Sequence, residues 1–195
     1  MLYSYFNKVY SLLMKLSKKG EYALRALIDL ATAELVGRRL LRVSEIAQKE
    51  KMSVKFLEQV MLQLREAGYV ASERGKFGGY RLARPASQIS LGQIVRLIDG
   101  PLAPIGCVSV SAYEPCSCPD EAHCGLRMVM LDVRNAIANI LDRYTLANVV
   151  EVTTRKMRRD GIPLPFTPPE PGQEKPPARR QGPSLLDEIM GEYTI

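Results

Sequence analysis

The sequence predicts a mainly α-helical protein with one small β-hairpin, arranged as a winged helix-turn-helix followed by a long dimerisation helix. Apolar residues recur with a helical period in three early segments, residues 16–36, 44–48 and 53–67. Two short strand-like segments, 69–74 and 79–83, then flank a glycine-bearing turn, which is typical of a hairpin. The helical period returns beyond residue 125 over a much longer stretch. Helix, helix, turn, helix and hairpin is the element order of a winged helix-turn-helix.

Residues with capping chemistry set the predicted helix boundaries. Ser17 is placed to cap the first helix, and Gly37 follows the end of its apolar stripe. Ser44 is the predicted N-cap of the second helix, and Ser53 that of the third. Gly68 stands where a C-terminal glycine is expected.

The second half of the sequence predicts three more helices and a tail. Ser90 is placed to cap a helix through Ile98, and the long helix from Gly125 carries one apolar stripe that either packs on its own domain or forms a two-fold dimer seam. Thr145 to Met157 predicts a further helix, and the proline-rich composition beyond it predicts disorder. The predicted parts are an N-terminal extension at 1–13 (with Met14 as an alternative start), a DNA-binding domain at 14–99, a cysteine loop at 100–124, the dimerisation helix with its successor at 125–158, and the tail at 159–195.

The positive charge is concentrated in the predicted DNA-binding domain. The formal net charge of the 195 residues is +6, whereas residues 14–84 hold 15 Lys and Arg against 8 Asp and Glu. A basic excess confined to one segment favours a polyanion-binding face. No export signal or membrane-spanning run is evident, so we expect a cytoplasmic protein with reduced thiols.

The second helix of a helix-turn-helix enters the major groove with its N-terminal part. On that part and on the hairpin we expect DNA contacts from Ser53, Lys55, Glu58, Gln59, Arg74 and Lys76. Each of these side chains alone is equally well explained as solvated surface, so the prediction depends on their joint placement. An enzyme is not expected, because a single histidine and the lack of a phosphate-cradling glycine loop leave no catalytic arrangement. A protein–protein adaptor built on a winged helix is the alternative.

All four cysteines fall in one loop, as Cys107, Cys116, Cys118 and Cys124. Metal ligation, an iron–sulfur cluster and a thiol switch are the chemical reasons for such clustering. The spacings do not resemble the paired knuckles of a zinc site. Acidic neighbours such as Glu114 and Glu121 argue against electropositive activation of a thiol.

The motifs together resemble the Rrf2 family of bacterial transcription regulators. The residues that carry this resemblance are Leu16-Ser-Lys-Lys-Gly-Glu-Tyr-Ala-Leu-Arg-Ala-Leu, Phe56-Leu-Glu-Gln, Leu64-Arg-Glu-Ala-Gly-Tyr-Val, Arg74-Gly-Lys-Phe-Gly-Gly-Tyr-Arg-Leu-Ala-Arg-Pro, Ile89-Ser-Leu, the cysteine loop, and Tyr144-Thr-Leu-Ala. The resemblance implies a DNA-binding homodimer, and in many members an iron–sulfur cluster at the dimer interface sets operator affinity. It also matches Glu58 and Arg74 to DNA-contacting positions, with Lys55 where some relatives carry a contacting serine.

The same resemblance suggests a ligand set for a [2Fe-2S] or [4Fe-4S] cluster, which the sequence does not distinguish. Cys118 and Cys124 match the second and third ligand positions, while Cys107 and Cys116 compete for the first. Some members use a histidine three residues after the last cysteine, where this chain has an arginine. Others use a carboxylate from the opposite subunit, whose position Glu21 occupies; an all-thiolate site within one chain is the alternative. We therefore rank an iron–sulfur cluster first, a thiol switch second and zinc third.

Overall fold

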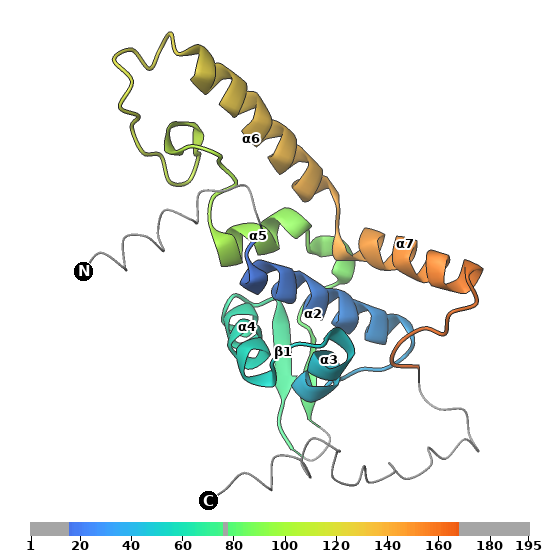
Figure 1. Ribbon diagram of the computed structural model, residues 1–195. Coiled ribbons are helices and arrows are strands. Elements are labelled where there is room, and N and C mark those ends of the chain that lie inside the picture. Colours follow the sequence, from blue (N-terminus) through green and yellow to red (C-terminus); the bar gives the residue numbers. More distant parts are fainter. Residues whose placement is uncertain (1–15, 76–77, 168–195) are drawn as a thin grey trace, which may run out of the picture.

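A computed structural model describes residues 16–75 and 78–167 of the chain (Figure 1). Its elements, in order, are α2 (Lys18–Leu35), α3 (Val43–Glu50), α4 (Val54–Glu66), β1 (Val70–Glu73), β2 (Gly79–Leu82), the 3-10 turn η2 (Ala86–Gln88), α5 (Leu91–Asp99), the 3-10 turn η3 (Gly106–Val108), α6 (Gly125–Arg143) and α7 (Leu146–Arg159). The described part of the chain contains no helix that is both long and apolar enough to cross a membrane.

Helix α2 is the centre of the fold. It packs against α4, α5, α7 and β2, and its residues Ala23, Ala26 and Leu27 are fully buried. The strands β1 and β2 pair antiparallel with Val70 opposite Leu82, and Leu41 adds a bridge to Tyr80. This arrangement of α2, α3, α4 and the hairpin confirms the predicted winged helix-turn-helix.

Most of the predicted helix starts are confirmed by cap hydrogen bonds. The Ser17 hydroxyl accepts from the Gly20 N–H at 2.9 Å, and Ser53 and Ser90 cap α4 and α5 in the same way. The prediction of Ser44 as a cap is wrong, because α3 begins at Val43. The Glu45 carboxylate accepts from the Arg42 N–H at 2.9 Å, and this bond starts the helix two residues earlier.

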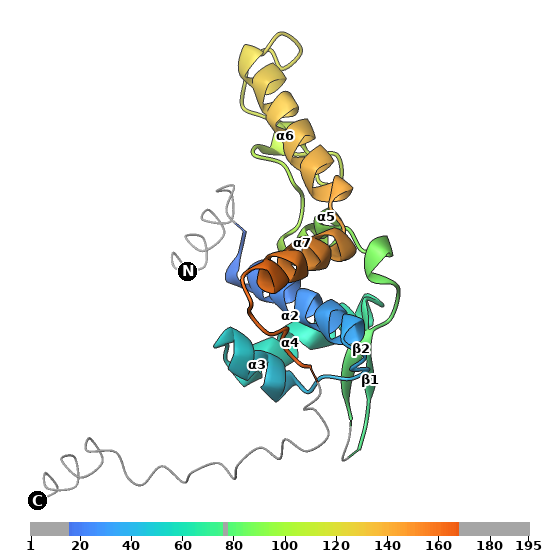
Figure 2. The ribbon, with the colours of Figure 1, turned by 90° about the vertical axis from the view of Figure 1, so that its right-hand side faces the viewer.

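Helix α6 extends away from the winged helix-turn-helix (Figures 1 and 2). Its junction with α7 is fastened to α5: the Leu91 N–H donates to the Tyr144 carbonyl at 2.9 Å, and Arg96 binds the Asp142 carboxylate through two bonds of 2.6 and 2.8 Å. None of its residues is buried in the described chain, and Leu126, Met128, Val129 and Ile140 are about half exposed or more. An apolar helix with this little cover needs a partner surface.

Buried charges join α2 to α3. Asp29 is fully buried in α2 and pairs with Lys49 of α3, while Arg25 binds the Glu50 carboxylate at 2.5 Å. Burial raises the pKa of Asp29 to about 6, although the hydrogen bond from Lys49 acts in the opposite direction.

The chain returns to α3 after α7. A turn at Gly161 ends α7, and Phe166 then packs against the core with its ring 5.6 Å from the Lys49 ammonium. Of the tail predicted for 159–195, only the part up to residue 167 is described, and the predicted N-terminal extension also lies outside the described residues.

Candidate nucleic-acid interface and thiol site

One face of α4 is buried and the opposite face carries the predicted base-reading side chains. Leu57, Val60, Met61 and Leu64 form the buried face, because they recur at the helical period. Lys55, Glu58 and Gln59 are exposed on the first turns of the helix. The structure thus brings these three side chains together on one accessible surface.

The candidate Ser53 and the nearby Gln63 have internal roles. The Ser53 hydroxyl accepts from the Phe56 N–H at 3.5 Å, so this residue caps the helix at the point where it would meet DNA. Gln63, further along, donates to the Leu97 carbonyl at 3.2 Å and is thereby directed toward α5. In the hairpin Arg74 is exposed directly after β1, whereas Lys76 lies outside the described residues.

All four cysteines line one cavity of about 230 Å³ between the cysteine loop and the start of α6. Cys107 is buried in η3, Cys116 and Cys124 are half-buried, and Cys118 is exposed. The loop folds back on itself because the Glu114 N–H donates to the Gly106 carbonyl at 3.2 Å. Cysteines up to 17 positions apart in the sequence are in this way collected around one space.

Three of the thiols have shifted pKa values. Burial raises the pKa of Cys107, and the Cys116 thiol and Glu121 add to the effect. Hydrogen bonds with Cys116 and Cys124 raise the pKa of Cys118 to about 12. The pKa of Cys124 is lowered, because its sulfur caps α6 and accepts from the Arg127 N–H at 3.5 Å. The lowered pKa of Cys124 results from its position at the start of a helix, and its neighbours in the sequence alone did not indicate it.

Glu121 connects several parts of this loop through its carboxylate, a role that the sequence did not indicate. Its carboxylate accepts from the Tyr113 hydroxyl at 2.7 Å and pairs with Arg127 at 3.1 Å. The Cys116 sulfur lies 3.8 Å from the same carboxylate. Arg127, which occupies the histidine position of some relatives, is therefore held by a carboxylate beside the thiols. The only sequence signal for this arrangement is the separation of six positions between the two charges.

Glu21 does not line the thiol cavity of its own chain. It lies in the first turn of α2, where it pairs with Lys18 at 2.7 Å and with Arg25 at 3.2 Å. The hydrogen bond from Lys18 lowers the pKa of Glu21. Its predicted role across a dimer interface remains a prediction. Among the residues that the structure describes, no group of three or more His, Cys, Asp or Glu could hold a single metal ion.

Comparison with known proteins places this arrangement in a family. Residues 16–152 match the family model of Rrf2, described as an iron-dependent transcriptional regulator. An rrf2-like HTH-type transcriptional regulator of Rhodobacter capsulatus is 42% identical over 137 residues, which cover 69% of this chain and 91% of the relative.

Solved structures agree with this assignment. CymR, the global cysteine regulator of B. subtilis, has 33% identity and a TM-score of 0.60, covering 71% of this chain and 97% of CymR. IscR of T. potens has 30% identity and a TM-score of 0.58, covering 73% of this chain and 90% of IscR. These relatives are transcription regulators and not enzymes. The chain belongs to the Rrf2 family of transcription regulators.

Proposed function

We propose that this protein is a cytoplasmic, homodimeric transcription regulator whose affinity for its operator depends on an iron–sulfur cluster held by the cysteine loop. The observation that carries the proposal is the cavity lined by all four thiols at the start of α6, a helix with no buried residue in the described chain. Both IscR and CymR are among the relatives of this chain, so the relatives alone do not decide between an iron–sulfur cluster and a thiol switch.

The donor set fits an iron–sulfur cluster. Thiolates are the ligands that such clusters take, and all four thiols of the chain line this one cavity. We assign Cys118 and Cys124 as two of the ligands and Cys107 or Cys116 as the third. When bound, the cluster would supply a redox-active group whose ligands can be lost or exchanged.

Residues around the cavity would stabilise the charge on a ligand sulfur and pass a change at that sulfur on to α6. The Arg127 N–H stabilises the charge on the Cys124 sulfur, and Glu121 fixes Tyr113 and Arg127 around the loop. Since Cys124 is also the cap of α6, a change at its sulfur acts directly on the first turn of that helix. If Glu21 of the partner subunit completes the site, its carboxylate would bind iron in place of Lys18 and Arg25, with which it now pairs.

The apolar stripe of α6 supports a dimer seam. Its half-exposed apolar side chains are ones that a second copy of the same helix could cover. A two-fold dimer presents two α4 helices to two operator half-sites, and their spacing tolerates little change. A rearrangement at the start of α6 would therefore alter operator affinity.

The cluster is tested by purification without oxygen. We expect iron and acid-labile sulfide in the protein and a visible absorption band, and we expect both to be lost in the variants Cys118→Ser and Cys124→Ser. Cys107→Ser and Cys116→Ser compared side by side identify the third ligand. Wild-type protein without iron, sulfide or visible absorption would refute the cluster and leave DNA binding untouched.

Base reading is tested separately with Glu58→Ala. A carboxylate that accepts from a cytosine amino group discriminates against other bases by about 1–3 kcal/mol. We therefore expect the variant to bind DNA with a relaxed preference at one position of each half-site. An unchanged preference in a selection from random DNA would contradict the base-reading role.

A thiol switch is the second candidate function, and the geometry at Cys124 favours it. A thiol of lowered pKa stands at a helix start and lines the same cavity as the Cys118 thiol. In the cluster-free protein a peroxide would oxidise the two thiols to one disulfide and be reduced to water, taking two electrons and two protons. A mass decrease of about 2 Da in peroxide-treated protein, absent in Cys118→Ser, would distinguish this switch from cluster chemistry.

A further inference from the structure

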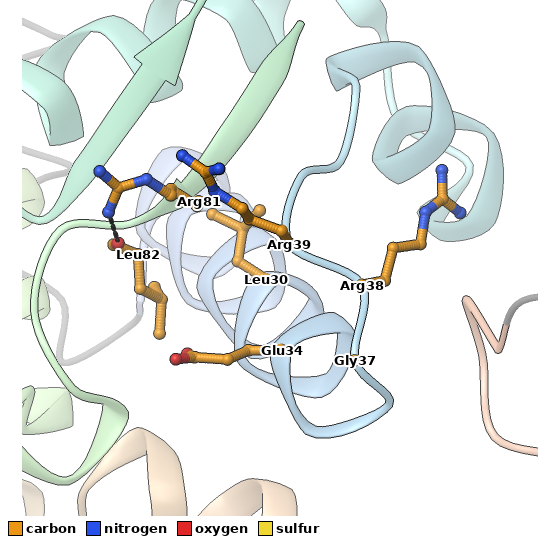
Figure 3. Close-up of a pocket in the computed structure, with 7 residues that line it drawn as sticks. All are labelled: Leu30, Glu34, Gly37, Arg38, Arg39, Arg81 and Leu82. Atoms are coloured by element: carbon orange, nitrogen blue, oxygen red, sulfur yellow. Dashed lines mark hydrogen bonds between the residues drawn. The ribbon is translucent and has the colours of Figure 1, made fainter. Parts of the chain in front are cut away.

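Three arginines and one carboxylate, Glu34, line a cavity on the side of the winged helix-turn-helix, at a site apart from α4 (Figure 3). The cavity has a volume of about 240 Å³ and lies between the end of α2, the loop that leads to α3, and β2. Arg38 and Arg39 come from that loop, and Arg81 comes from the strand. Figure 3 shows the guanidinium groups of Arg39 and Arg81 on the same side, while that of Arg38 points toward α3.

Two of these arginines share a single carboxylate. The Arg39 guanidinium lies 2.5 Å from Glu73 Oε1, and Nε of Arg81 lies 3.3 Å from the same oxygen atom. Arg38 instead pairs with Glu45 at the start of α3. Two guanidinium groups on one carboxylate leave an excess of one positive charge, and the Arg39 and Arg81 side chains are 72% and 42% exposed.

Glu73 links this pair of arginines to the wing. Glu73 is the last residue of β1 and precedes Arg74, the exposed residue predicted to reach DNA. Strand β1 packs against α4, which carries the proposed base-reading side chains. Arg81 therefore lies on the same hairpin as the proposed wing contact, and the shared carboxylate of Glu73 holds Arg39 of the preceding loop beside it.

We propose that Arg39 and Arg81 together bind one backbone phosphate of the operator, outside the bases read by α4. The proposal rests on the proposed function as a DNA-binding regulator and adds a phosphate site to it. Planar guanidinium groups bind phosphate oxygens through two parallel bonds, which suits them to this ligand. In the free protein Glu73 holds both side chains in place, and the phosphate replaces it as their acceptor. Contacts of this kind fix the register of the protein on the duplex without selecting a sequence.

The salt dependence of DNA binding tests this inference. Each phosphate contact contributes about 0.9 to the slope of the logarithm of the binding constant against the logarithm of salt concentration. Arg39→Gln should therefore lower the slope of the dimer by roughly 1.8, and Arg81→Gln should do the same. Both variants should lose affinity by the same factor on operator and on scrambled duplexes, in fluorescence anisotropy titrations of the full-length protein.

A matched control is available on α7. Arg155 is 73% exposed and pairs with Glu151, much as Arg39 is 72% exposed and pairs with Glu73. Arg155→Gln removes the same charge and should leave the slope unchanged. Glu73→Gln removes the competing acceptor and should tighten DNA binding, whereas a purely structural ion pair would make this variant bind more weakly.

The outcomes separate this inference from the proposed function. If Arg39→Gln and Arg155→Gln have the same slope, or if Glu73→Gln weakens binding, the phosphate site is wrong while selective binding by the wild type still stands. If the wild type itself does not prefer its operator, the proposed function fails. Saturable binding of inorganic phosphate at matched ionic strength, lost in Arg39→Gln, would overturn the assignment to DNA and point to a free anion.

Discussion

The ion pair between Asp29 and Lys49 predicts how the stability of the helix-turn-helix depends on pH. Asp29 is fully buried, its Oδ2 atom has no hydrogen-bond partner among the described residues, and its pKa is raised from 3.8 to about 6. A carboxyl whose pKa is higher in the folded state holds its proton more tightly there than in the unfolded chain. Its contribution to stability is therefore full below pH 4 and is lost as the pH rises through 6.

The magnitude follows from the shift. A difference of roughly two pKa units at 1.36 kcal/mol per unit gives about 3 kcal/mol per subunit. Asp29→Asn removes the titration and keeps the shape and an acceptor for Lys49. The variant should gain about 3 kcal/mol on the wild type between pH 4 and pH 7.

Urea denaturation of the reduced, cluster-free protein at fixed subunit concentration measures this difference. The free energies of unfolding of the two proteins should be compared at each pH, because other carboxyls titrate equally in both and cancel. Parallel pH profiles for wild type and Asp29→Asn would refute the argument that burial outweighs the pairing with Lys49. A variant that loses stability relative to the wild type as the pH rises would show that the pair favours the charged form.

Three further substitutions, of which Gly125→Ala is a control, test how α6 and the segment after α7 are attached. Gly92→Ala would place a methyl group 2.1 Å from the Asp142 carboxylate. This clash should break the ion pair between Arg96 of α5 and Asp142 of α6 and lower the free energy of unfolding by about 1 kcal/mol or more. Gly125→Ala meets nothing within 4 Å and should be neutral or slightly stabilising in the same urea titration; equal effects of the two would contradict the close contact. Phe166→Ala removes a half-buried ring from the core and from Lys49 and should cost about 2 kcal/mol, so an unchanged urea midpoint would show that this segment is not attached in solution.

Local chemistry explains why most helices were predictable. Ser17, Ser53 and Ser90 each accept a backbone N–H three residues later, and this pattern is readable in the sequence. The start of α3 was missed because the bond comes from Glu45 back to the Arg42 backbone, so a cap in which the acidic side chain closes the first turn outweighed the serine preference.

Contacts between distant segments were not predictable. Nothing in the local pattern links Asp29 to Lys49 or brings Phe166 onto α3, because these contacts depend on how the helices cross. The clustering of the cysteines was evident from the sequence. Which thiol is acidic was not, because this depends on Cys124 standing at the first turn of α6.

The position of Cys124 makes one backbone amide a reporter of sulfur chemistry. The Arg127 N–H that binds this sulfur is also one of the first donors of α6, and has no other acceptor within its own helix. A negatively charged sulfur holds that amide firmly, whereas a disulfide sulfur is a weak acceptor and releases it to solvent. Hydrogen exchange at this single amide would therefore follow the redox history of the protein without any label on the cysteines.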